Sequence, residues 1–173
     1  MVKILLLSVF LLTTISTTAQ LKGENAADCD LPDPARLRLA KASHYDLSCT
    51  LNPTHLQGDF DGDGKPDYAI LVVNKATKKH GIAVVKSSAT AVEILGAGGT
   101  KLRVSSGPDS YWLDDFDWMD RWHVEPKHKV TEGLGSKVAA TMRGDGIVVE
   151  KSEAASALVF WNGKRWLWKQ MGD

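Results

Sequence analysis

The chain of 173 residues contains only two cysteines, and they do not form a C-x-x-C pair. Its five histidines are scattered without the spacing of a zinc site. The motifs that surround a nucleophilic serine or cysteine are also absent. These absences argue against a zinc centre, a dithiol redox site and catalysis through a covalent intermediate.

The chain has no excess of either charge, since 21 basic residues balance 21 acidic ones and the isoelectric point is about 7.0. A neutral protein lacks the basic field that attracts nucleic acid or anionic lipid. The apolar run near the amino terminus covers only residues 4–12, which is too short to span a bilayer. We therefore expect neither a nucleic-acid partner nor a membrane span.

The first residues have the three parts of a secretory signal peptide. Lys3 supplies the charge, residues 4–12 are the apolar segment, and residues 13–19 are small, with Thr17 and Ala19 at the cleavage positions. Cys29 lies too far downstream to be the lipid-modified cysteine of a bacterial lipoprotein. The sequence predicts a signal peptide over residues 1–19 and a single exported domain over residues 20–173, which would be periplasmic or extracellular.

The two cysteines, Cys29 and Cys49, both lie in the predicted mature chain. In an oxidising compartment two cysteines most simply pair with each other. A bridge that closes a loop of about twenty residues would stabilise the fold by roughly 3 kcal/mol in the chain-entropy model. We predict a disulfide between them.

The most specific motif in the sequence is an acidic stretch that leads into an apolar run. Four aspartates alternate with other residues around a central glycine: Asp59, Asp61, Asp63 and Asp67. Acids at the first, third, fifth and ninth positions can surround a calcium ion, which takes six to eight oxygen ligands. Gly64 would allow the sharp turn, and the Lys65 carbonyl falls where a backbone ligand belongs.

This stretch does not have the pattern of an EF-hand. The twelfth position is Ile70, where an EF-hand has a bidentate glutamate. No amphipathic helix precedes the loop, and the β-branched and aromatic residues 68–73 predict a buried strand after it. We expect a calcium loop that leads into a strand.

In this form, residues 58–73 resemble the metal loop of the FG-GAP (VCBS-type) repeats of integrin-like propellers. The resemblance implies calcium held by the four aspartate side chains and the Lys65 carbonyl, in a structural or adhesive extracellular module. The sequence has no second copy of the motif, whereas a propeller needs at least about four blades. We therefore expect a single-copy FG-GAP-like protein without the propeller fold. The alternative is an Asp/Gly-rich turn that binds no metal.

Short patterned segments predict an α+β fold that is mainly antiparallel, with one or two short helices. Asp33 and Pro34 are suited to begin a helix that ends near Lys41. The predicted strands are residues 68–73, 82–85, 92–95, 137–142, 147–151, 156–161 and 164–171. Arg143-Gly144-Asp145 matches the tripeptide that integrins bind, but a hairpin turn at residues 144–146 explains it equally well.

The last predicted hairpin turns at Asn162-Gly163, a dipeptide that favours a two-residue type I′ turn. That turn pairs Val159 with Trp166 and places Trp168 on the same face of the sheet. We expect both tryptophans to belong to the core.

The segment from Asp109 to Asp120 alternates carboxylates with aromatic residues. Such a segment could stack on a sugar, and Asp115 with Asp117 could act as general acid and base on a glycosidic bond. Alternatively, the aromatics are core residues and the acids are solvated. We name Trp112, Trp118 and Trp122 as a possible recognition surface. A second metal at Asp114, Asp115 and Asp117 would lack the ordered spacing and the glycine of the first loop.

Taken together, the sequence predicts an exported, calcium-binding, non-catalytic module with a structural or binding role and a glycan or protein ligand. Two alternatives stay open: a glycan-acting hydrolase that uses the Asp109 to Asp120 segment, and an inhibitor or immunity-type partner of another secreted protein. The sequence does not determine the oligomeric state.

Overall fold

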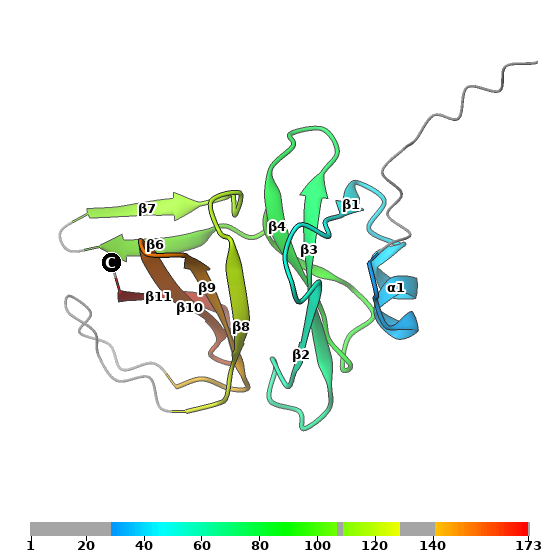
Figure 1. The fold of residues 1–173 in the computed structure, drawn as a ribbon. Coiled ribbons are helices and arrows are strands. Elements are labelled where there is room, and N and C mark those ends of the chain that lie inside the picture. The colour runs from blue at the N-terminus through cyan, green and yellow to red at the C-terminus, as the bar shows by residue number, and fades with distance from the viewer. Residues whose placement is uncertain (1–28, 107–108, 129–140, 173) are drawn as a thin grey trace, which may run out of the picture.

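The computed structural model describes residues 29–106, 109–128 and 141–172. The predicted signal peptide, residues 1–19, lies outside these ranges. In the described residues the structure has one helix and eleven strands (Figure 1). They are α1 (Asp33–Leu39), β1 (Tyr45–Leu47), β2 (His55–Gly58), β3 (Asp67–Asn74), β4 (His80–Val85), β5 (Glu93–Gly96), β6 (Leu102–Ser106), β7 (Asp109–Leu113), β8 (Arg121–Glu125), β9 (Gly146–Lys151), β10 (Ala155–Trp161) and β11 (Trp166–Gly172).

Strand β3 is the centre of the first sheet. It pairs antiparallel with β4 along one edge and with both β1 and β2 along the other, and β5 continues the sheet beyond β4. Residues 69–72 of β3 are buried on both faces, which explains the continuous apolar run of this strand.

The second sheet is an antiparallel meander in the order β11-β10-β9-β8. A separate two-stranded hairpin is formed by β6 and β7. Figure 1 shows three layers, with α1 on the right, strands β1 to β4 in the middle and β8 to β11 on the left.

Alternate residues of β3 face two different cores. Ala69 and Leu71 belong to the core between the sheets, with Ile147, Val159 and other residues of the second sheet. The opposite face of the first sheet packs against the helix. That second core is formed by Leu31, Ala35, Leu39, Ile70, Val72, Ala83 and Val85. The period of two in side-chain direction thus lets one strand hold the helix and both sheets together.

Cys29 and Cys49 lie at disulfide distance, with their Cα atoms 5.6 Å apart. This proximity agrees with the predicted pairing. The pair links the residues before α1 to those after β1, so it closes the segment that carries the helix. Among the described residues there is no helix with the length and apolar character needed to cross a membrane.

The mainly antiparallel, β-rich α+β fold is confirmed, with one short helix in the described residues. The sequence predicts Asp33 as the N-cap of the helix. In the structure Pro32 is the N-cap, and Asp33 is the first residue of α1. Five short strands, β1, β2, β6, β7 and β8, were not predicted. The predicted strand at residues 137–142 falls mostly outside the described residues. Among the described strands, the partners of β9 are β8 and β10.

The predicted register of the last hairpin is wrong by two residues. Trp166 pairs with Trp161 and Trp168 with Val159. The turn is longer than expected because the Asn162 side-chain oxygen accepts hydrogen bonds from the backbone N–H groups of Lys164 and Arg165, each at 2.9 Å. A shift of two residues keeps every side chain on its face. Both tryptophans therefore still point to the core between the sheets, with Trp166 buried and Trp168 half-buried.

Candidate functional site

The acidic loop, residues 59–67, connects β2 to β3 at one end of the first sheet. Strands β2 and β3 are paired without a break from His55 and Ile70 to Gly58 and Asp67, where the loop begins. Gly62 and Gly64 have positive φ angles of 76° and 83°, which glycine adopts without strain. The loop leads directly into a strand, as its sequence predicts.

Asp67 is the first residue of β3, and its side chain is fully buried. Its carboxylate accepts backbone hydrogen bonds from Phe60 at 3.0 Å, Asp61 at 3.3 Å and Ser87 at 2.6 Å. Burial raises the pKa of Asp67, and the negative charge of Asp61 raises it further, although the backbone hydrogen bonds act in the opposite direction. A buried carboxylate of this kind is stabilised by a nearby cation.

Three carboxylates of the loop converge. One side-chain oxygen from each of Asp59, Asp61 and Asp67 lies within 4.8 Å of the others. Two oxygens on opposite sides of one ion, each about 2.4 Å from it, are about 4.8 Å apart, so the three could hold a single metal ion. None of the three forms an ion pair with a base in the described part of the chain.

Asp63 does not belong to this cluster. Its carboxylate instead accepts hydrogen bonds from the Lys65 backbone N–H at 2.8 Å and from the Ser87 hydroxyl at 3.1 Å. Ligation by Asp63 and by the Lys65 carbonyl stays a prediction. The carboxylate of Asp59 accepts backbone hydrogen bonds from Gly62 at 2.8 Å and from Gly64 at 3.0 Å, which fix the shape of the loop.

Two serines after β4 also contact the acidic loop. Ser87 contacts Asp67 through its backbone N–H and Asp63 through its hydroxyl. The hydroxyl of the next residue, Ser88, donates a hydrogen bond to the Asp61 carboxylate. The sequence does not indicate these serines, because they lie twenty or more residues from the acids that they contact.

A third segment, distant in the sequence, forms hydrogen bonds with the acidic loop through Asp145. The Asp145 carboxylate accepts hydrogen bonds from the backbone N–H of Asp59 at 2.9 Å and of Lys127 at 3.0 Å, and the Asp145 N–H donates to the Asp59 carbonyl at 2.6 Å. The Arg143-Gly144-Asp145 tripeptide therefore packs against the acidic loop, and its aspartate is engaged within the protein.

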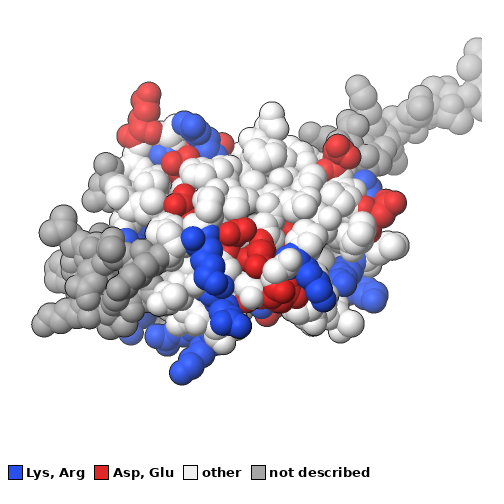
Figure 2. Space-filling view, turned by 90° about the horizontal axis from the view of Figure 1, so that it is seen from below, with Lys and Arg blue, Asp and Glu red and all other residues white. Residues whose placement is uncertain are grey.

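Figure 2 views the molecule from below, toward the end where β2 joins β3. Acidic side chains gather in the middle of this face, with basic side chains on both sides. The acidic surface is thus local and does not extend over the whole face.

The three tryptophans of the predicted recognition surface have different environments. Trp112 is 64% exposed, whereas Trp122 is 4% exposed and its indole N–H donates to the Pro53 carbonyl at 2.7 Å. Trp118 is half-buried against Trp168, with ring centroids 6.1 Å apart. The assignment of Trp122 to a surface is wrong, because its position in β8 points into the core between the sheets. Only Trp112 presents most of its ring to solvent.

The acids of the same segment make hydrogen bonds within the protein. The Lys79 ammonium donates to Asp114 at 2.5 Å, and this contact is the main cause that lowers the pKa of Asp114. The backbone N–H of Ser152 is the main cause that lowers the pKa of Asp120. Asp115 accepts backbone hydrogen bonds from His80 at 2.8 Å and Asp117 at 3.2 Å. A general acid needs a raised pKa, so Asp114 and Asp120 give no support to a hydrolase.

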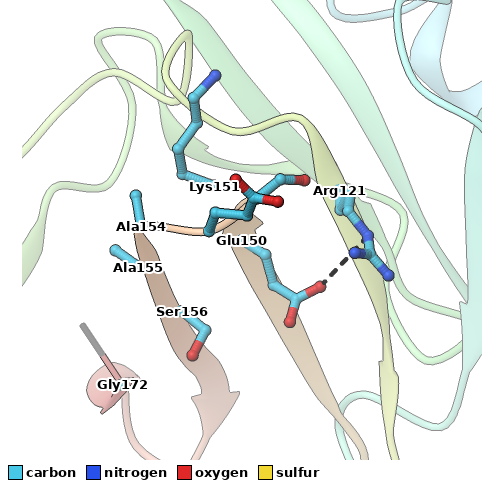
Figure 3. A pocket seen from close by; sticks show the side chains of 9 residues that line it. Arg121, Glu150, Lys151, Ala154, Ala155, Ser156 and Gly172 are labelled. Carbon is cyan, nitrogen blue, oxygen red and sulfur yellow. Dashed lines mark ion pairs between the residues drawn. The ribbon is translucent and has the colours of Figure 1, made fainter.

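Two surface hollows lie elsewhere. The larger, beside the turn between β9 and β10, includes an ion pair between Arg121 and Glu150 at 3.9 Å, and Figure 3 shows these two side chains pointing toward each other. The smaller is lined by residues that include Ser48, Leu71 and His80. Neither hollow brings together a set of catalytic groups.

Comparisons of the chain with protein-family models, with curated proteins and with solved structures found no match.

Proposed function

We propose that this protein is an exported calcium-binding module with a structural or binding role rather than a catalytic one. The observation that carries the proposal is the convergence of the Asp59, Asp61 and Asp67 carboxylates within 4.8 Å. No described base neutralises them. Uncompensated like charges at this separation repel each other, and a bound cation removes the repulsion.

The chemistry of the donors favours calcium. The candidate ligands are all oxygens, without a histidine or cysteine among them, and carboxylate oxygens suit hard cations such as calcium and magnesium. The order of the aspartates and glycines resembles the calcium loop of FG-GAP repeats. Calcium accepts a variable number of oxygens at about 2.3 to 2.6 Å, whereas magnesium requires near-ideal octahedral geometry.

A bound calcium ion would connect two parts of the first sheet. Asp67 begins β3, and its carboxylate accepts from the Ser87 N–H just after β4. Ser88 reaches the same loop through Asp61. Calcium at the three aspartates would therefore hold the β2–β3 connection and the end of β4 in one arrangement, and would stabilise the folded state only.

Export is proposed from two features. The amino terminus has the charged, apolar and small-residue parts of a signal peptide. Cys29 and Cys49 lie at disulfide distance, and disulfides persist mainly in oxidising compartments. A periplasmic or extracellular location also offers free calcium to a low-affinity site.

A calcium titration of thermal unfolding tests the proposal. We predict that the wild-type protein gains about 2.7 kcal/mol at a calcium concentration one hundred times the dissociation constant. Asp61→Asn should lose most of this gain, because it removes a ligand charge from the three-carboxylate cluster. Asp117→Asn is the matched control, since Asp117 is exposed and lies outside the loop.

The control variant should respond to calcium as the wild type does. If the melting temperature of the wild type is unaffected by both calcium and chelator, the acidic loop is a metal-free turn. An equal response of wild type and Asp61→Asn would place the calcium site elsewhere.

A further inference from the structure

Along β6 the residues of one face are buried and the residue between them is exposed, whereas on β7 Tyr111 is 55% exposed although it pairs with the buried Val104. Leu102 and Val104 of β6 are each 1% exposed, whereas the intervening Arg103 is exposed. Arg103 pairs directly with Trp112 across the two strands. Since paired residues of an antiparallel ladder point to the same face, Arg103 and Trp112 share the solvent face.

This solvent face carries a compact set of ligand-binding groups. Trp112 is 64% exposed. Ser110 is two residues before Trp112 on β7, so it lies on the same face. Its hydroxyl accepts a hydrogen bond from Arg103 Nη2 at 3.2 Å. Across the described residues, no carboxylate forms an ion pair with Arg103.

We propose that Arg103, Ser110 and Trp112 bind a glycan whose sugar units carry a carboxylate. This inference rests on the proposed function, because it gives the binding module a ligand class. The exposed indole offers an apolar surface for stacking on the flat face of a sugar ring. The guanidinium has a planar fork of donors that matches a carboxylate, and no acid of the described protein occupies it.

Charge and size favour a glycan over a protein partner. The apolar residues of β6, Leu102 and Val104, are buried, so the face that carries Arg103 offers one indole among polar groups. A stable protein interface buries about 800 Å² on each partner. The spacing of about 5 Å between paired residues instead fits one sugar unit, with its ring on Trp112 and its carboxylate on Arg103.

Isothermal titration of the full mature protein tests the proposal, with short oligomers of galacturonate, alginate and hyaluronan as probes. The matched neutral ligand for each probe is its methyl ester, which keeps the ring and removes the charge. We expect at least one carboxylated probe to bind, and its ester to bind about tenfold more weakly. Arg103→Gln should lose about tenfold for the acid and little for the ester. Trp112→Ala should weaken both.

Lys164→Gln is the charge-matched control, because it removes one exposed positive charge in the β10–β11 turn; it should bind as the wild type does. No binding to any of the three probes would overturn the inference, as would equal binding of acid and ester. If Trp112→Ala instead abolishes self-association measured by light scattering and changes no glycan binding, the face is a protein contact. The calcium response of the same samples is a separate readout, so failure here is distinguishable from failure of the calcium site.

Discussion

Gly144 shows how closely the acidic loop is packed against a distant segment. A Cβ atom at this position would lie 1.9 Å from the Asp59 carbonyl oxygen and 2.6 Å from the Gly62 nitrogen. Both are backbone atoms, so no side-chain rotation relieves the contact. The residue must therefore be glycine for space, although its φ angle is not in the left-handed region.

Gly144→Ala should therefore reduce both stability and calcium response. We predict a loss of about 3 kcal/mol in the free energy of unfolding, because the loop and the turn before β9 must separate. Gly163→Ala is the control: Gly163 has φ of 93° but no atom within 4 Å of its Cβ position. That variant should lose only about 1 kcal/mol and keep its calcium response.

Urea unfolding with and without calcium measures both quantities. Equal losses of stability for the two glycine variants would mean that the backbone angle at residue 144, rather than the close approach of the acidic loop, requires a glycine there. A normal calcium response in a destabilised Gly144→Ala would show that the Arg143-Gly144-Asp145 turn does not shape the loop.

The candidate site could be predicted from the sequence only where its residues are neighbours in the chain. Asp59, Asp61 and Asp67 stand within nine residues, and their spacing alone indicates oxygen ligands. Ser88 and Asp145 approach the loop from 27 and 86 residues away. Nothing in the sequence around either residue indicates a contact with the acidic loop, because that contact depends on how the sheets fold over one another.

At the level of elements, the segment from β7 to β8 separates into a surface part and a core part. Trp112 on β7 is exposed, whereas Trp122 on β8 fills the core and donates a hydrogen bond to Pro53. Each tryptophan has both polar and apolar neighbours in the sequence, so the difference comes from the faces that the two strands bury.

Alanine substitution should separate the two tryptophans. We predict that Trp122→Ala costs about 3 to 5 kcal/mol, as other buried aromatic truncations do. Trp112→Ala should change the free energy of unfolding by less than about 0.5 kcal/mol, because it removes an exposed ring. Denaturant unfolding of both variants measures this; similar losses would mean that the β6–β7 hairpin buries Trp112 in solution.

Strands that contain an apolar run could be predicted, and strands with alternating or mostly polar residues could not. The predicted strand at residues 68–73 lies inside β3, and that at residues 82–85 lies inside β4. β1 has only three residues and β2 four, too few for a period of two to be distinguished from a loop. The last hairpin was predicted with the wrong register because the Asn162 side chain extends the turn.

Across the whole molecule, a polar cluster around the buried Lys86 joins the acidic loop to the second sheet. The Lys86 ammonium lies 2.7 Å from Glu93 and 4.3 Å from the centre of the Trp161 ring. Glu93 also accepts the Trp166 indole N–H at 2.6 Å. Since Lys86 directly precedes Ser87, which contacts Asp67, the loop and both sheets are connected by one short run of the chain.

The Cys29–Cys49 pair joins the remaining layer, the helix, to this assembly. The closed segment contains α1, whose Ala35 and Leu39 are buried against the first sheet. Reduction should therefore cost the chain-entropy contribution of a loop with a sequence separation of 20, roughly 3 kcal/mol. For a domain of this size, the melting temperature should fall by roughly 6 to 12 °C.

Calorimetry with and without reductant measures this fall, and a nonreduced digest of the native protein identifies the linked peptides. The double variant Cys29→Ser with Cys49→Ser is the control: it should melt near the reduced wild type and be insensitive to reductant. Because the bridge acts mainly on the unfolded chain, the reduced protein should keep its calcium response. Two freely alkylated thiols in native material would contradict the pairing, and a reduced protein that no longer responds to calcium would show that the helix layer and the acidic loop are coupled.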